Sequence, residues 1–434
     1  MTTNETAPAL PPGGGARGLS KRILAFAGVP FLALVAPFLF LPVLARVAGA
    51  DAWVAIAVGQ SVGGFVALVS GLGYPTLAPP QVAIASAERR RRILATSLHT
   101  RVPVWAVGAI VGAVIAALLA PASHRADAAM MAGSISLAGL APTWYWIGVG
   151  RALPILWFEV LPRMMATLAA TGILLAGGGV FWYPVLLGIA MIAGPAIVYT
   201  RFAGREAVRP ARADIGAVYR LHPPAVIAET AAGAYNALAV ALVTGVATVS
   251  QSARYVSGDK AYRIGQYSVT ALGNALQGWV AEALEHRDAL GRRLRIAVLL
   301  HAGLGILGLV VFTLIGPELT SILFGHAVEI DRLTAFGFGV ATLGISLGTA
   351  CGRIGLVTLG ARKTFMVCVL VAASIGVVGL LVGGGVWGAP GAACGLGIAE
   401  LTSGLLQGAV LLARWRRGTL TVPSTHVGVG ADGR

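Results

Sequence analysis

Three ionisable side chains lie close together in an otherwise apolar part of the sequence. Asp259, Lys260 and Arg263 fall within the segment ARYVSGDKAYRIGQYSVTALGNALQGWV, residues 253–280. An acidic and a basic residue four positions apart on a helix form an ion pair. A lysine and an arginine one turn apart bind a phosphate group together, the arginine through its planar fork and the lysine as a point charge. The surroundings decide between these chemistries, because a charged group in a membrane faces a protein interior or a water-filled cavity rather than lipid.

The composition predicts an all-α polytopic membrane protein with about 12 transmembrane helices. Of the 434 residues, 57% are hydrophobic and 11% charged, and the mean hydropathy is +0.81. Three cysteines, Cys351, Cys368 and Cys394, lie in apolar runs without metal-ligand spacing, so we expect small buried residues and no metal, cofactor or disulfide. The expected spans are residues 24–45, 53–73, 102–120, 129–149, 156–177, 181–200, 223–246, 256–279, 296–315, 332–351, 364–384 and 391–412.

The basic residues predict the orientation. With a cytoplasmic N-terminus and an even number of spans, most of the 32 lysine and arginine residues fall on the cytoplasmic side. We therefore predict a multi-pass protein of the inner (plasma) membrane with both termini in the cytoplasm. The net charge of +15 is then explained by topology and by contact with anionic lipid, and we expect no nucleic-acid partner. The basic cytoplasmic segments are ERRRR (88–92), RFAGREAVRPARADIGAVYR (201–220), EHRDALGRRLR (285–295), GARK (360–363) and RWRR (414–417).

The order of spans and loops suggests two similar halves. The segment ARVAGADAWVAIAVGQ joins spans 1 and 2, and SQSARYVSGDKAYRIGQ joins spans 7 and 8; in both, a tight turn precedes an aromatic residue, Trp53 or Tyr255. Two six-span halves of equal orientation imply a parallel repeat about a central cavity. We expect a disordered cytoplasmic tail (1–20), an N-lobe with spans 1–6 (21–215), a C-lobe with spans 7–12 (216–415) and a second cytoplasmic tail (416–434).

Polar side chains of span 8 gather on one face. At about 100° per residue, they occupy an arc of about 160° along the whole span, opposite an apolar face. This pattern predicts a wet stripe that faces the bundle interior and marks a substrate or ion path. A structural ion pair between Asp259 and Arg263 is the alternative, but it leaves Lys260 unexplained. The stripe comprises Tyr255, Asp259, Lys260, Tyr262, Arg263, Gln266, Tyr267, Thr270, Asn274 and Gln277.

Two further carboxylates are expected inside the membrane. Glu229 shares one face of span 7 with Asn236 and is predicted to face the stripe. Glu400 in span 12 is either a proton site or a hydrogen bond that packs helices together. Together with Asp259, these are the expected ion-coupling residues.

No motif for enzyme chemistry is present. The sequence lacks a Gly-rich phosphate loop followed by Lys and Ser or Thr, an HExxH helix, a CxxC pair and a nucleophile elbow. The longest expected outside loop, GPELTSILFGHAVEID, is too short to form a domain. The sequence therefore predicts a transporter and not an enzyme.

Three segments resemble Wzx-type flippases of the multidrug/oligosaccharidyl-lipid/polysaccharide exporter superfamily. They are GLAPTWYWIGVGRALPILWFEVLPRMMATLAATGILL (139–175), LPVLARVAGADAW (41–53) and SARYVSGDKAYRIGQ (252–266), which occur in the family's order. The resemblance implies two six-helix lobes around a central cavity and transport of polyprenyl-pyrophosphate-linked glycans to the outer leaflet. Asp259 and Lys260 fall on the family's acidic-Lys pair. Arg46, Trp144, Arg151, Glu159 and Arg163 fall on its first-lobe positions, whereas Ile147 and Val149 replace more polar or aromatic residues.

The expected function is therefore a lipid-linked oligosaccharide flippase that works by alternating access. Its expected partners are the glycan lipid, the bilayer, and a polymerase and glycosyltransferases of the same pathway. The alternatives are a cation or drug antiporter of the same superfold, a lipid II flippase and a membrane scaffold without transport. The residues expected to bind substrate are Lys260, Arg263, Tyr255, Tyr262, Gln266, Asn274, Arg46 and Asn236.

The basic loops generate a prediction about topology. Reporter fusions after Arg92, Arg212, Arg293 and Lys363 should report the cytoplasm, and fusions after Ser123, Ser252 and Glu329 the outside, because lysine and arginine remain on the cytoplasmic side. Paired fusions that are active on opposite sides measure this directly. An outside signal from the fusion after Arg212 would contradict the two-lobe arrangement.

Overall fold

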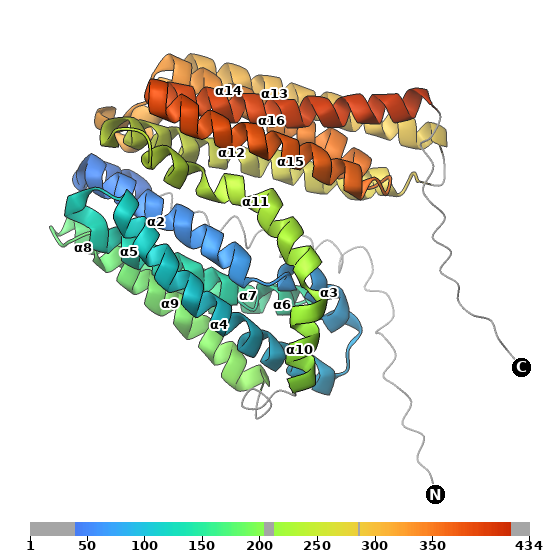
Figure 1. Cartoon of the computed structure of the whole chain (residues 1–434), viewed down its shortest axis with the longest axis horizontal. Coiled ribbons are helices and arrows are strands. Elements are labelled where there is room, and N and C mark those ends of the chain that lie inside the picture. Colours follow the sequence, from blue (N-terminus) through green and yellow to red (C-terminus); the bar gives the residue numbers. More distant parts are fainter. Residues whose placement is uncertain (1–39, 204–211, 285–286, 418–434) are drawn as a thin grey trace, which may run out of the picture.

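The computed structural model describes residues 40–203, 212–284 and 287–417, and every regular element within these ranges is a helix (Figure 1). The helices of the first half are α2 (Gly49–Ser70), α3 (Tyr74–Ile84), α4 (Ala87–Leu119), α5 (Arg125–Ser136), α6 (Thr143–Val149), α7 (Leu153–Ile155), α8 (Leu161–Leu175) and α9 (Trp182–Val198). Those of the second half are α10 (Arg212–Leu221), α11 (Pro223–Thr244), α12 (Val249–Ala281), α13 (Arg287–Phe324), α14 (Arg332–Gly348), α15 (Arg362–Val378) and α16 (Gly384–Arg416).

The predicted class, an all-α polytopic membrane protein, is confirmed. Within the described ranges, seven helical runs are long and apolar enough to cross a membrane. The 33-residue α12 is not among them, because uncharged polar side chains such as Gln266, Asn274 and Gln277 lower the hydropathy even of its charge-free part. The run from Arg362 to Arg416 contains two helices, since the backbone leaves the helical conformation at Gly388, where φ is 65°.

Most predicted spans coincide with helices, but the span 129–149 is wrong as one helix. Helix α5 ends at Ser136, a 3-10 turn covers Leu137–Leu140, and α6 begins only at Thr143. Pro142 explains the break, because proline has no N–H to donate and keeps the residue before it out of the helical conformation. Most of the predicted span 24–45, and the tails 1–20 and 418–434, lie outside the described residues.

The sequence also missed helical structure in the predicted cytoplasmic loops. Helix α4 begins at Ala87, so the ERRRR segment forms its first turns instead of a loop. Ser86 caps this helix, and its Oγ accepts a hydrogen bond from the Arg89 amide at 3.3 Å. The short helices α3 and α10 were not predicted.

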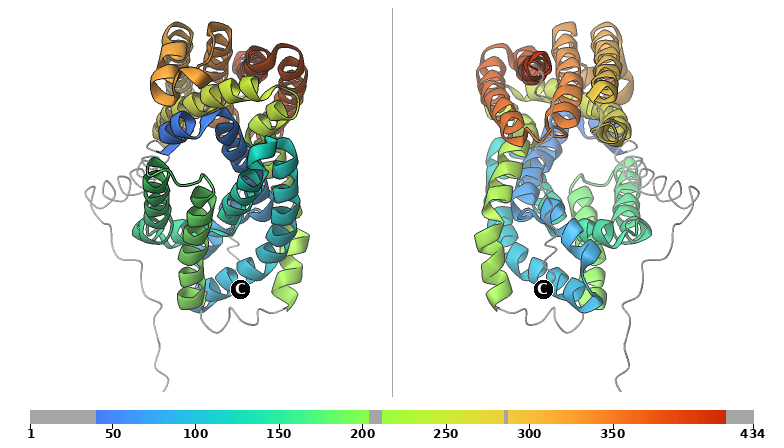
Figure 2. Two further views of the ribbon diagram at one scale, coloured as in Figure 1. Left: turned by 90° about the vertical axis from the view of Figure 1, so that its left-hand side faces the viewer. Right: turned by 90° about the vertical axis from the view of Figure 1, so that its right-hand side faces the viewer.

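The helices form two groups that meet at α2 and α11. Helices α12–α16 pack with one another, as do α2 and α4–α9, while α2 contacts both α11 and α12 (Figure 2). Small residues allow close packing, as expected in a membrane. At Gly344 of α14, for example, an added Cβ would lie 2.3 Å from the Glu400 backbone of α16.

The two groups converge at the end where α2 and α12 begin and separate toward the other end (Figure 1). At the converged end, Trp53 Nε1 donates to the Ala253 carbonyl at 3.3 Å, and the Trp53 ring lies 5.2 Å from that of Phe324. Arg46 also donates to the Ile322 carbonyl here. The two loop-to-helix segments that suggested a repeat therefore lie against each other at the interface.

Candidate functional site

The candidate site lies where α12 meets α2 and α11. Lys260 of α12 donates from Nζ to Oε1 of Gln60 on α2, at 2.7 Å. Residues so far apart in sequence meet because α2 packs against α12. Lys260 thus connects the two groups of helices through a single hydrogen bond between side chains.

Arg263 and Asp259 form the ion pair that their spacing predicts. Nε of Arg263 lies 2.7 Å from Oδ2 of Asp259, and Nη2 donates to the Asn236 carbonyl of α11 at 2.8 Å. The Asp259 side chain is 2% exposed and that of Arg263 is 38% exposed. Nη1 of Arg263 has no hydrogen-bond partner among the described residues.

The charges at this site do not cancel. Arg263 neutralises Asp259, whereas Lys260 pairs with the uncharged amide of Gln60. Among the side chains that the structure describes here, one positive charge therefore remains, together with unused N–H groups on Lys260 and on Nη1 of Arg263. This arrangement can accept an anion that bridges the two side chains.

The predicted stripe of span 8 is buried near the start of α12 and accessible along the rest of the helix. Tyr255 and Tyr262 are buried against Phe338 of α14, at ring distances of 5.4 and 5.7 Å. Near the other end of α12, Asn274 accepts a hydrogen bond from Arg353 at 2.7 Å. From Lys260 to Asn274 the helix rises about 21 Å. Between these two residues, Gln266 is half-buried and Thr270 is exposed, so this part of the stripe remains accessible.

Two other predicted substrate residues take different positions. Arg46 lies at the converged end, and α2 rises about 16 Å from Gly49 to Gln60, which separates Arg46 from Lys260. Asn236 does reach the site, but through its backbone carbonyl.

Glu400, another predicted ion-coupling residue, is bound by a residue of α11. Glu400 is buried and accepts a hydrogen bond from the Tyr235 hydroxyl at 2.5 Å, which connects α16 to α11. Of the two roles expected for Glu400, this contact fits the packing hydrogen bond. The side chain of Glu229 lies outside the described residues.

Apart from Arg46, the first-lobe residues of the resemblance lie near the break between α5 and α6. Glu159 accepts a hydrogen bond from Thr143 Oγ1 at 2.6 Å, and Arg163 lies 3.9 Å from the same carboxylate. Trp144 is buried beside the guanidinium of Arg101, which lies 5.6 Å from its ring. Arg151 is exposed.

Arg101 explains how the broken helix is tolerated. Its fully buried side chain donates from Nη1 to the carbonyls of Gly139 and Ala141, at 2.8 and 3.3 Å. These carbonyls lose helical partners at the break, and an unsatisfied backbone group is costly in a membrane. Sequence analysis missed Arg101 because it adjoins the basic loop. It also missed Gln60, although an amide in the apolar run of α2 was a visible signal.

No protein-family model matches the sequence, and a search of curated proteins finds no match to it. Solved structures do share the fold. An inward-facing multidrug resistance MATE family transporter of the MOP superfamily has a TM-score of 0.64 at 14% identity, covering 92% of this chain and 98% of that one. The lipid II flippase MurJ in an inward closed conformation has a TM-score of 0.65 at 12% identity, covering 90% and 87%.

A MOP superfamily transporter from Pyrococcus furiosus, described as having a binding pocket of reverse polarity, has a TM-score of 0.53 at 15% identity, covering 93% of this chain and 95% of that one. At such identities the likeness shows the fold alone. The chain therefore has the fold of membrane transporters and flippases of this superfamily.

The ion pair generates a prediction about stability. Arg263→Gln should destabilise the protein strongly, because it leaves the buried Asp259 carboxylate without its counter-ion. Asp259→Asn added to Arg263→Gln should recover part of the loss, with a coupling of about 0.5–3 kcal/mol. Unfolding of the wild type, both single variants and the double variant in one detergent measures this coupling. Strictly additive losses would show that the pair contributes nothing.

Proposed function

We propose that the protein is a flippase that moves a polyprenyl-pyrophosphate-linked oligosaccharide from the cytoplasmic to the outer leaflet by alternating access. The observation that carries the proposal is the excess of positive charge where α2, α11 and α12 meet, formed by Lys260 and Arg263 with Asp259 as the acid paired to Arg263. A pyrophosphate carries negative charge through a region where an uncompensated charge is costly. Partly exposed cations of the protein compensate the negative charge of the pyrophosphate.

The geometry suggests how the anion is held. Pyrophosphate oxygens bind the unused N–H groups of Lys260 and draw its ammonium away from Gln60, which breaks the 2.7 Å hydrogen bond between α12 and α2. Nη1 of Arg263 donates to the same anion while Nε stays on Asp259. Binding therefore removes one contact between the two groups of helices, and this couples the substrate to their relative movement.

The contacts at the converged end agree with an inward-facing state. Under the predicted orientation this end faces the outside, where Arg46, Trp53 and Phe324 hold the groups together. The groups separate toward the cytoplasmic side, from which the lipid enters. Release to the outer leaflet then requires the Trp53 and Arg46 contacts to break.

The site disfavours the alternative of a cation or drug antiporter, although MATE transporters share the fold. A cation site needs a free carboxylate, and Asp259 is neutralised by Arg263.

A lipid II flippase handles a similar pyrophosphate-linked lipid and remains the nearest alternative, supported by the likeness to MurJ. For both flippases, we propose a plasma-membrane location with both termini in the cytoplasm. A polymerase and glycosyltransferases are proposed as pathway partners.

The cation pair is tested by glycan export in cells. Lys260→Ala should abolish export at wild-type protein levels, since it removes the unpaired charge but only one hydrogen bond. Arg263→Lys should restore part of the activity lost in Arg263→Ala, because the charge returns without the fork. Lys363→Ala, the same change at an exposed position, is the matched control and should export normally. Normal surface glycan in both Lys260→Ala and Arg263→Ala would refute the site.

A second prediction concerns coupling to an ion gradient. Amide replacements at Glu229, Asp259 and Glu400 test whether a buried carboxylate exchanges an ion during transport. We expect the largest loss of gradient-dependent flipping from Asp259→Asn or Glu229→Gln. The loss in Glu400→Gln should be smaller, because Glu400 is engaged by Tyr235. If all three variants respond to the gradient like the wild type, no buried carboxylate couples transport.

A further inference from the structure

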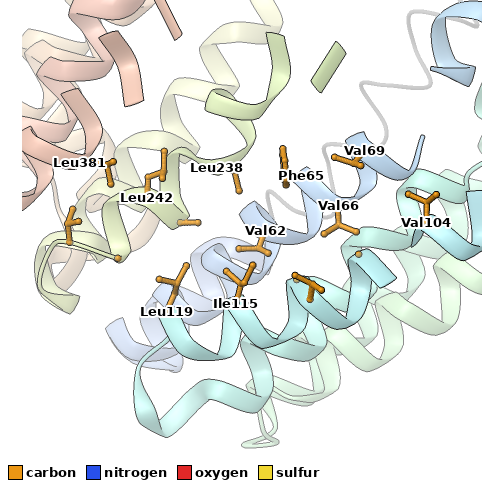
Figure 3. A pocket seen from close by; sticks show the side chains of 16 residues that line it. Val62, Phe65, Val66, Val69, Val104, Ile115, Leu119, Leu238, Leu242 and Leu381 are labelled. Carbon is orange, nitrogen blue, oxygen red and sulfur yellow. The ribbon is translucent and has the colours of Figure 1, made fainter. Parts of the chain in front are cut away.

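An apolar groove of about 510 Å³ lies between the two groups of helices (Figure 3). Its floor is α2, and its walls are α4 on one side and α11 with Leu381 on the other. All its lining residues are apolar or glycine; they include Val62, Val66, Ile115, Leu119, Leu238 and Leu242. The adjoining face of α4 is exposed and apolar, as at Ile110 and Val114, so in a membrane the groove opens toward lipid.

The groove and the cation site lie on opposite sides of one helix contact. On α2, Gln60 binds Lys260 and Val62 lines the groove, while Ser61 between them contacts α11. The order is the same on α11. The Asn236 carbonyl binds Arg263, the Ala237 carbonyl accepts from Ser61, and Leu238 lines the groove.

Ser61 makes two hydrogen bonds across this contact. Ser61 Oγ donates to the Ala237 carbonyl at 2.6 Å and accepts from the Ala241 amide at 3.2 Å. These two backbone groups are four residues apart and would pair with each other in a regular helix. The contact that includes this hydroxyl, and that continues to Leu68 and Gly233, therefore separates a cationic site from an apolar groove at the same height.

We propose that the groove holds the hydrocarbon chain of the lipid whose anionic head occupies the Lys260 and Arg263 site, with the chain passing between α2 and α11. This inference rests on the proposed function and adds the place of the isoprenoid chain. An ordinary phospholipid keeps its head at the membrane surface. Gln60 lies near the middle of α2, about 15 Å from either end, so only a lipid whose head is drawn to this depth spans both sides of the contact.

The chain's position is tested by photolabelling. The probe is a polyprenyl pyrophosphate with a diazirine on its chain, added to the purified full-length protein in nanodiscs. We expect labelled peptides from α2, α4 and α11, and loss of this label with excess unmodified polyprenyl pyrophosphate or in Lys260→Ala. Val111→Trp fills the groove and should weaken labelling by about tenfold. Ile110→Trp, one position away on the exposed face, is the matched control and should leave the labelling unchanged.

The outcomes separate the inference from the function on which it rests. Lys260-dependent binding with label outside the groove would overturn the inference and leave the flippase proposal standing. Labelling of the groove could instead be equally strong with a diazirine phosphatidylcholine and unaffected by Lys260→Ala. This result would show that bulk lipid occupies the groove, which also overturns the inference. Absence of Lys260-dependent binding would overturn both.

Discussion

The arrangement of the second group of helices depends on keeping a buried carboxylate neutralised. Asp259 is almost fully buried in α12, and Arg263 is its ion-pair partner. Breaking such a pair costs about 3–5 kcal/mol when the remaining charge stays buried. Both residues lie on α12, so the pair lets this face of the helix be buried in the bundle, and the same face carries Lys260 toward α2. Because Arg263 also binds the Asn236 carbonyl, the same pair ties α12 to α11.

The membrane imposes a second constraint, that buried backbone groups must find partners. The break before α6 would leave the Gly139 and Ala141 carbonyls unsatisfied, and Arg101 binds both. Arg101 is thus a fully buried structural cation, whereas Lys260 is half-buried at the contact between the two groups of helices. Both cations have neutral partners, so access and unused N–H groups, rather than uncompensated charge alone, distinguish a binding site from a structural cation.

The sequence predicted what depends on local pattern. Apolar runs of bilayer length located most helices, and the spacing of Asp259 and Arg263 predicted their ion pair. It failed where the outcome depends on residues far apart in the chain. Tyr255 and Tyr262 share an arc with Lys260, but Phe338 of another helix buries them. The pairing of Lys260 with Gln60 depends on how α2 crosses α12, which no periodicity encodes. Pro142 was a readable signal for the broken helix, yet the apolar run outweighed it.

The central claim is that the cations at the junction of α2, α11 and α12 carry a lipid pyrophosphate across the membrane. Reconstitution tests it most directly, in proteoliposomes that contain a fluorescent polyprenyl-pyrophosphate oligosaccharide and a membrane-impermeant quencher of its label. We predict that wild-type protein and Lys363→Ala exchange the lipid between leaflets and that Lys260→Ala does not. The opposite result would be that the wild type leaves the lipid in its original leaflet and exchanges an organic cation for protons at the same rate as Lys260→Ala. That result would contradict the account.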